Sequence, residues 1–290
     1  MAINDVASDF AYFLAYPIAK ETEMRSILVH ADSDAAAEGR LQVALDLARR
    51  FDGHVTLMIA TPLQQFVSFD PFGGSYFAVE ALAKAQADDL ALEADLAGRL
   101  AKEDVPWDIV VADGDIAGSL AIAATLSDLA VVSLSGGGKS AASSLLAGDL
   151  ALATSTPVLA LPQGTTQLDP DAPAMVAWNG SAQAAAALRA ALPLLRDRAV
   201  TLVSVGEEDG AFPGTDALRY LSRHGIHAEL RTVAREGETA EERLEKEAAA
   251  LGAGLIVMGA FGRGRLRETL FGGATHYLVT SGRFPLLLAH

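Results

Sequence analysis

Two stretches of the chain that lie far apart follow the same order of apolar runs, and this repeat constrains the fold most strongly. Short apolar runs typical of buried strands alternate with segments whose apolar residues recur at helical spacing. Each series closes on a proline followed by four apolar residues, at Pro157–Leu161 and Pro285–Ala289, which start 128 residues apart. Two copies of one β/α unit explain this order, so we predict an α/β protein made of two tandem open parallel-sheet sandwiches.

The predicted elements divide the chain into an extension, two copies and a seam. In the first copy, strands are expected at 26–30, 54–60, 107–112, 129–134 and 157–161, with helices around 41–48, 78–102 and 116–126 and a long loop over 61–77. In the second copy, strands are expected at 174–178, 199–205, 227–233, 255–258 and 285–289, with helices after 181, at 216–223 and at 239–251. We therefore predict an extension at 1–23, domains at 24–162 and 174–290, and a turn-rich linker at 163–173.

Composition excludes several classes of protein. The 290 residues carry a net charge of −15, which disfavours nucleic acid and anionic membrane surfaces as partners. The absence of cysteine excludes disulfides, thiolate metal sites and a cysteine nucleophile. Residues 1–23 have no basic region before their apolar run, which argues against a secretory signal. With no run long enough for a membrane-spanning helix, a cytoplasmic protein is the expectation.

The predicted strand at 255–258 runs directly into a glycine-rich loop. Gly259, Gly262 and Gly264 follow the strand, and Gly272 and Gly273 then open an apolar segment of helical character. Glycine allows a ligand to approach the backbone, and the free N–H groups of a helix N-terminus favour an anion. The pattern therefore favours a phosphate cradle, with local positive charge from Arg263, Arg265 and Arg267. The alternative is that these glycines only turn the chain.

The spacing of these glycines resembles the nucleotide-loop signature of the universal stress protein family. Gly259, Gly262 and Gly272 match the signature, whereas Gly273 stands where the family has serine or threonine, and a hydroxyl returns only at Thr275. The resemblance covers nearly all of 24–290 in the form of the tandem members. It implies a Rossmann-like fold of the adenine nucleotide alpha hydrolase type. It also implies a stress-response protein that binds ATP or another adenine nucleotide, with Mg²⁺ entering only alongside the nucleotide.

Carried over position by position, the resemblance implies a ligand site in the second copy. The first loop and the end of the second strand would face the base and ribose, and the glycine loop would face the phosphates. The residues nominated are Ala177, Trp178, Asn179, Val205, Met258, Gly259, Gly262, Arg263, Gly264, Gly272, Gly273 and Ala274. Asn179 replaces the acidic residue of the family, which Asp32 retains in the first copy. An amide accepts ribose hydroxyls more weakly than a carboxylate does.

The first copy has its own glycine loop, Ser133–Ser140, but the match is incomplete. Ser133 stands in the place of Gly259, and the later glycine falls out of register at Gly148. The ending Gly138-Lys139-Ser140 resembles a Walker A loop, which also requires a glycine five residues before Gly138. We therefore interpret this loop as a degenerate copy, with a weakened phosphate site as the alternative.

The sequence predicts neither a metal site nor a fast catalytic centre. His224 and His227 are the only close pair of histidines, and the sequence places no third ligand near them. Ser181 lacks the glycines of a nucleophile elbow, so we expect it to cap the following helix, and Asp115 similarly precedes a helix start. Neither glycine loop offers an obvious base for activating water. A nucleotide-binding sensor is preferred, and a scaffold protein without nucleotide and a slow ATP hydrolase are the alternatives.

The two apolar tails predict how the copies join. A proline at the start of a strand suits a sheet edge, and a bare apolar edge invites pairing with another strand. The family resemblance implies that single-domain members dimerise through this last strand. We therefore predict that the two tails pair antiparallel within one chain as an internal pseudo-dimer. Any homodimer would then use another surface, such as the aromatic loop at 66–77.

Overall fold

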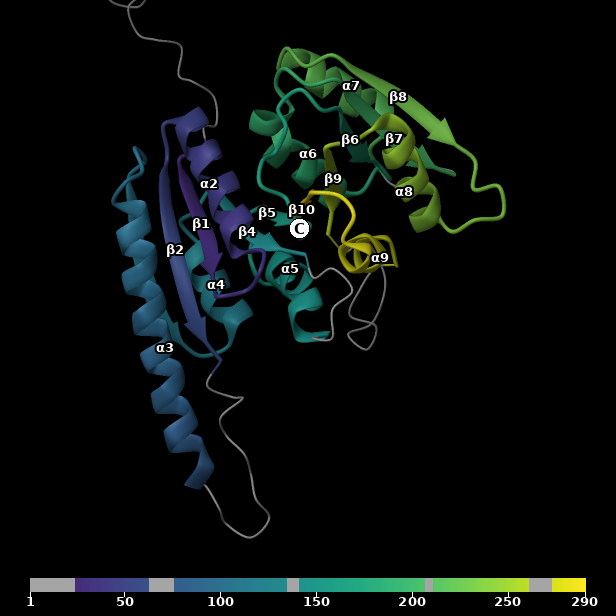
Figure 1. Cartoon of the computed structure of the whole chain (residues 1–290). Coiled ribbons are helices and arrows are strands. Elements are labelled where there is room, and N and C mark those ends of the chain that lie inside the picture. Colours follow the sequence, from purple (N-terminus) through teal and green to yellow (C-terminus); the bar gives the residue numbers. More distant parts are fainter. Residues whose placement is uncertain (1–23, 63–75, 135–140, 207–210, 261–272) are drawn as a thin grey trace, which may run out of the picture.

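The computed structural model describes residues 24–62, 76–134, 141–206, 211–260 and 273–290 (Figure 1). Ten strands form one sheet in the order β3-β2-β1-β4-β5-β10-β9-β6-β7-β8. The strands of the first half are β1 (Ser26–Ala31), β2 (His54–Thr61), β3 (Trp107–Asp113), β4 (Leu129–Ser133) and β5 (Val158–Leu161). Those of the second half are β6 (Ala174–Ala177), β7 (Val200–Val205), β8 (Ala228–Val233), β9 (Leu255–Gly259) and β10 (Leu286–Ala289). The two halves therefore have the same strand order, which confirms the predicted α/β fold class.

Helices cover both faces of the sheet (Figure 1). One core lies beneath α2 (Ala37–Phe51), α3 (Tyr76–Leu100), α6 (Ala182–Leu195) and α7 (Gly214–Arg223). The other lies beneath α4 (Ile116–Ala124), α5 (Ala141–Ala153), α8 (Ala240–Leu251) and α9 (Gly273–Ser281). The four central strands are buried on both faces except for the half-buried Gly259, which explains why their sequences are continuous apolar runs and do not alternate.

The halves join through their last strands, as predicted. Leu286, Leu287 and Leu288 of β10 lie opposite Ala160, Leu159 and Val158 of β5 in an antiparallel pair. The other eight strand pairs are parallel. Because of the one antiparallel junction, the strands of the two halves point in opposite directions. Their carboxyl ends therefore form two separate edges of the sheet, one for each half.

The strand registers define which residues of the two halves correspond. Ile27 lies opposite Val55 and Leu129, just as Ala174 lies opposite Val200 and Leu255. Counting along the strands from these pairs shows which positions of the two halves are equivalent. Asp32 is equivalent to Asn179, Ala60 to Val205, and Ser133 to Gly259. The predicted match of Ser133 with Gly259 is thereby confirmed.

The helix starts follow local side chains. The Asp115 carboxylate accepts from the Gly118 N–H at 2.7 Å, and the Ser181 hydroxyl accepts from the Ala184 N–H at 3.1 Å. Both residues are N-caps, which confirms the cap predicted at Ser181, whereas for Asp115 only the start of a helix was predicted. Thr239 and Glu242 form a reciprocal capping box at the start of α8. Such caps fix where the chain turns into each helix at the sheet edge.

One helix was not predicted from the sequence. The α5 segment consists largely of alanine, serine and leucine, and no clear polar stripe marks its outer face. Its helicity comes from burial, since Ala147, Leu150 and Ala151 pack into the second core. The helix predicted from residue 78 begins at Tyr76, and the rest of the predicted 61–77 loop, from 63 to 75, lies outside the described residues.

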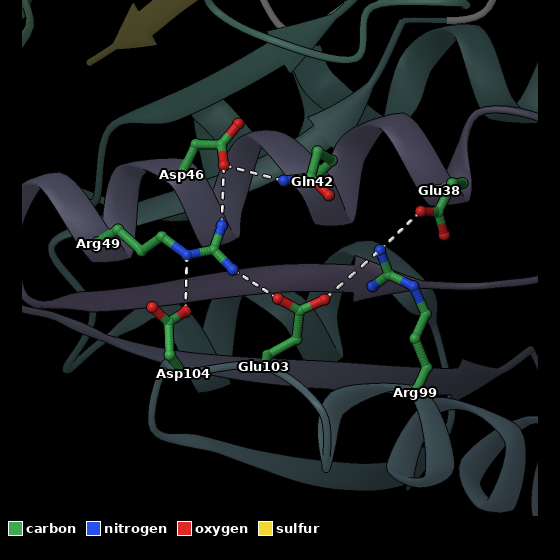
Figure 2. A network of polar contacts seen from close by, with 7 residues as sticks. All are labelled: Glu38, Gln42, Asp46, Arg49, Arg99, Glu103 and Asp104. Carbon is green, nitrogen blue, oxygen red and sulfur yellow. Dashed lines mark hydrogen bonds and ion pairs between the residues drawn. The ribbon is translucent and has the colours of Figure 1, made fainter.

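An ion-pair network connects α2 with the turn after α3 (Figure 2). The Arg49 guanidinium contacts Asp46, Glu103 and Asp104 at 2.5–2.9 Å, and Arg99 contacts Glu38 at 2.6 Å. The Arg49 side chain is 34% exposed, so water screens these pairs and each adds little stability. The network mainly fixes where the end of α3 lies against α2. Within the described parts of the chain, none of the helices is long and apolar enough to cross a membrane.

Candidate functional site

Each half has one place where the strand order reverses. In the second half this is the pair β6–β9, and in the first half the pair β1–β4. In open parallel sheets the loops at such a switch point leave the sheet toward opposite faces, and ligands bind in the crevice between them. The candidate site therefore consists of the residues at the carboxyl ends of these strands.

Gly259 ends β9 in close contact with α6. A Cβ atom placed on Gly259 would lie 2.5 Å from the Gln183 carbonyl carbon and 2.6 Å from the Ala184 nitrogen. Only glycine fits this position, because the neighbouring atoms belong to the helix backbone. The sequence predicted that a ligand approaches the backbone at Gly259, whereas the group found there is the first turn of α6. The preceding Met258 is buried in the core, opposite the half-buried Ala177.

Trp178 and Asn179 are both engaged in local structure. The Trp178 side chain is buried, and its indole N–H donates to the Phe212 carbonyl at 3.1 Å. The exposed Asn179 accepts from the Ser181 N–H at 3.1 Å through its Oδ1 atom, which stabilises the turn into α6. The amide oxygen that would face a ribose is therefore already used once, although it retains a second lone pair.

The end of β7 adds an apolar side chain and a cation. Val205 is half-buried, and the chain leaves the strand at Gly206 with φ +77. A Cβ on Gly206 would lie 3.4 Å from the Arg235 Nε atom. Sequence reasoning missed Arg235, because the residue becomes a neighbour of β7 only through the pairing of β7 with β8.

The start of α9 lies against an acidic side chain. A Cβ on Gly273 would collide with the Glu241 Oε1 atom, so the carboxylate of α8 stands beside the first residue of α9. A carboxylate suits a helix N-terminus for the same electrostatic reason that a phosphate does. Glu241 thus occupies a position expected for the phosphate. Ala274 is half-buried and packs into the second core.

Four nominated residues cannot be placed. Gly262, Arg263, Gly264 and Gly272 lie outside the described residues, as do Arg265 and Arg267. The part of the site that the structure does describe brings together Ala177, Asn179, Gly259 and the first turn of α6.

At the corresponding edge of the first half, a buried arginine joins the ends of β1 and β4. Arg40 is 1% exposed. Its Nε donates to the His30 carbonyl at 2.6 Å, Nη1 to the Ser133 hydroxyl at 2.5 Å, and Nη2 to Asp32 Oδ1 at 2.6 Å. The first-strand loop and the end of the fourth strand therefore meet here as expected, but a side chain that the sequence analysis did not single out connects them.

The electrostatics of this cluster follow from burial. Desolvation lowers the pKa of His30 to about 4, against a smaller opposing effect of Asp32, so its imidazole is neutral at pH 7. The pKa of Asp32 is lowered because Arg40 and His30 together outweigh its desolvation. The part of the chain that the structure covers contains no group of three or more histidines or carboxylates suited to a metal ion.

Comparisons with known proteins give a family match for the second half and similar structures for both halves. The Universal stress protein family model matches residues 173–290. A universal stress protein from Archaeoglobus fulgidus is similar in structure, with a TM-score of 0.71 and 14% identity over 92% of this chain and 96% of that chain. A Pseudomonas aeruginosa protein assigned to the same family gives a TM-score of 0.55 and 17% identity, over 92% of this chain and 93% of its own. No curated protein sequence matches the chain.

The two structural likenesses establish the fold over both halves, and the family match gives the assignment of the second. Residues 173–290 therefore form a domain that matches the universal stress protein family, and the first half shares the fold of that domain.

Proposed function

We propose that the second half binds an adenine nucleotide, ATP or a related ligand, at the carboxyl edge of β6, β7 and β9. The chain would act as a stress-response sensor or regulator without fast catalysis. One observation carries the proposal: the half that matches the family model is the half whose described strand ends at the switch point are uncharged and whose β9 ends against the first turn of α6. Mg²⁺ would enter only together with the nucleotide.

The residues at this edge suit the two ends of a nucleotide. Ala177 and Val205 are half-buried and apolar, so a planar base can lie against them without displacing a charge. Gly259 holds the end of β9 against the first turn of α6, which fixes that helix start at the switch point. Arg235 adds a positive charge at the end of β7, in a chain whose net charge of −15 otherwise repels phosphate.

The second candidate function is that of a scaffold protein that binds other proteins without nucleotide. The position of Glu241 favours this candidate. Its carboxylate stands at the start of α9, where it opposes a phosphate electrostatically and by occupying the space. Asn179 adds to this, because an amide replaces a charged acceptor. If these two features dominate, the second half keeps the family fold but does not bind ATP.

Calorimetry on a matched pair of variants tests the first proposal. Val205→Trp places an indole at the end of β7, whereas Ala60→Trp does the same at the corresponding position of β2. We expect ATP to bind the parent, and Val205→Trp to weaken binding by about tenfold or more, a loss of at least roughly 1.4 kcal/mol. Ala60→Trp should leave the affinity unchanged. Equal losses from the two variants would refute the second-half site.

Glu241→Gln decides between the two candidates. Removing the negative charge should raise ATP affinity by about two- to fivefold, the effect of one partly exposed charge. Glu229→Gln, on the exposed face of β8, makes the same change in net charge away from the site and should have no effect. If the parent and both variants fail to bind ATP, the scaffold candidate is supported.

A further inference from the structure

Arg40 of the first half lies in a buried cluster with His30, Asp32 and Ser133. The guanidinium is buried between the ends of β1 and β4, and three of its donors are used at distances of 2.5–2.6 Å. Arginine is rarely buried to this extent unless a fitted set of acceptors surrounds it. The position is the topological switch point, where an open parallel sheet ordinarily holds a ligand.

In the described parts of the chain, the groups that contact the guanidinium are hydrogen-bond acceptors. These groups are the His30 carbonyl, the Ser133 hydroxyl and the Asp32 carboxylate, with Asp34 Oδ1 3.7 Å from Nη1. The His30 ring lies 3.4 Å from Asp32 and is neutral at pH 7, so it adds no positive charge. Without Arg40, the remaining lining would carry two negative charges and would repel a phosphate.

The second half differs at the same positions. The residues that correspond to Asp32 and Ser133 are Asn179 and Gly259, neither of which carries a charge or a hydroxyl. The Asn179 amide turns back to the Ser181 N–H, and Gly259 packs against the helix backbone. Among the described residues, the first switch point therefore carries buried charges at positions where the second carries none.

We propose that the first-half switch point is a cation pocket specific for a guanidinium group, and that Arg40 fills it as a built-in ligand. The first half therefore needs no nucleotide to be complete and has no affinity for phosphate. This proposal stands on the geometry of the first half alone, and it holds whether or not the second half binds ATP. The ligand class that fits the emptied pocket is a small guanidinium or amidinium ion.

Chemical rescue of Arg40→Ala in the full chain tests the pocket. We expect the variant to unfold at a lower temperature than the parent, because two carboxylates lose their partner. Methylguanidinium chloride at millimolar concentration should restore most of that loss, with a midpoint that rises with the logarithm of concentration. Methylammonium chloride at equal ionic strength should not, because one ammonium cannot span acceptors on two strands. ATP should not stabilise the variant more than the parent.

Arg49→Ala is the matched control, since it also removes an arginine from three acidic partners (Figure 2). Its site is open to solvent, so no pocket remains and methylguanidinium should give no rescue. If Arg40→Ala does not fold, its yield on refolding from urea with and without methylguanidinium replaces the melting experiment. A double variant with Asp32→Asn should then need at least about tenfold more methylguanidinium, as for a lost charged partner. Absent rescue, or equal rescue in Arg49→Ala, would overturn the proposal.

Discussion

The buried imidazole of His30 makes a quantitative prediction about stability and pH. Burial lowers the pKa of His30 from 6.5 to about 4 in the folded chain, against a smaller opposing effect of Asp32. The unfolded chain therefore binds a proton at a higher pH than the folded chain does. Between these two pKa values the unfolded state holds more protons, so stability falls as the pH falls through this window. Above pH 7 the imidazole is neutral in both states and contributes no pH dependence.

The size of the effect follows from the two pKa values. One unit of pKa is about 1.4 kcal/mol, so the parent should lose about 2 kcal/mol by pH 5 and about 3 kcal/mol by pH 4 on account of His30. His30→Ala, which introduces the residue found at the corresponding position 177, removes the titration. The substitution also leaves a cavity, which lowers the stability of the variant by the same amount at every pH. It therefore does not affect how the difference between the two proteins changes with pH.

Urea denaturation of the parent and His30→Ala from pH 4 to pH 8 measures this difference. The two stability curves should converge toward low pH by about 3 kcal/mol, with most of the change between pH 6.5 and pH 4. Parallel curves over the whole range would refute the reasoning. They would mean that water reaches the imidazole in the folded chain.

Three further predictions concern packing, the helix start and the junction. Gly259→Ala should lower the free energy of unfolding by about 1–3 kcal/mol, because the new Cβ meets helix backbone. Gly98→Ala, with open space around it, should raise the free energy of unfolding by about 0.5–1 kcal/mol. Urea midpoints measure both changes, and equal effects would contradict the packing argument. Gly273→Ser should tighten ATP binding by several-fold only when combined with Glu241→Ala, because the carboxylate otherwise meets the new side chain. Calorimetry that shows the same gain from the single variant would mean that Glu241 does not lie there. A fragment that ends at Pro162 should self-associate in sedimentation runs through its uncovered β5, and a folded monomeric fragment would argue against that edge as the junction.

Patterns that depend on neighbours along the chain were predictable from the sequence. The apolar runs of β4, β5, β9 and β10 predicted the strands. Proline at the start of each tail indicated a sheet edge, and the family resemblance indicated the antiparallel junction in which Leu287 lies opposite Leu159. Ser181 was predictable as a helix cap, and Asp115 as the site of a helix start, because a cap is a local contact. Strand–helix alternation then determined the right fold class.

Contacts between distant elements were not predictable. Arg40 lies next to the apolar Leu41 in the first turns of α2, and nothing in that pattern shows that its side chain points to the strand ends. Glu241 belongs to an ordinary charged helix start, and its place beside Gly273 depends on how α8 and α9 pack. Gly259 was recognised as a close-approach glycine, but only the structure identifies α6 as its neighbour. In each case the missing information is tertiary packing.

Native mass spectrometry of the intact chain titrated with ATP tests the central claim most directly. We expect one ATP per chain, because Asn179 and Gly259 leave the described strand ends of the second-half switch point uncharged, whereas Arg40 fills the first. The single bound nucleotide should disappear in Val205→Trp and persist in Ala60→Trp. Two nucleotides per chain, or none at saturating concentration, would contradict the account.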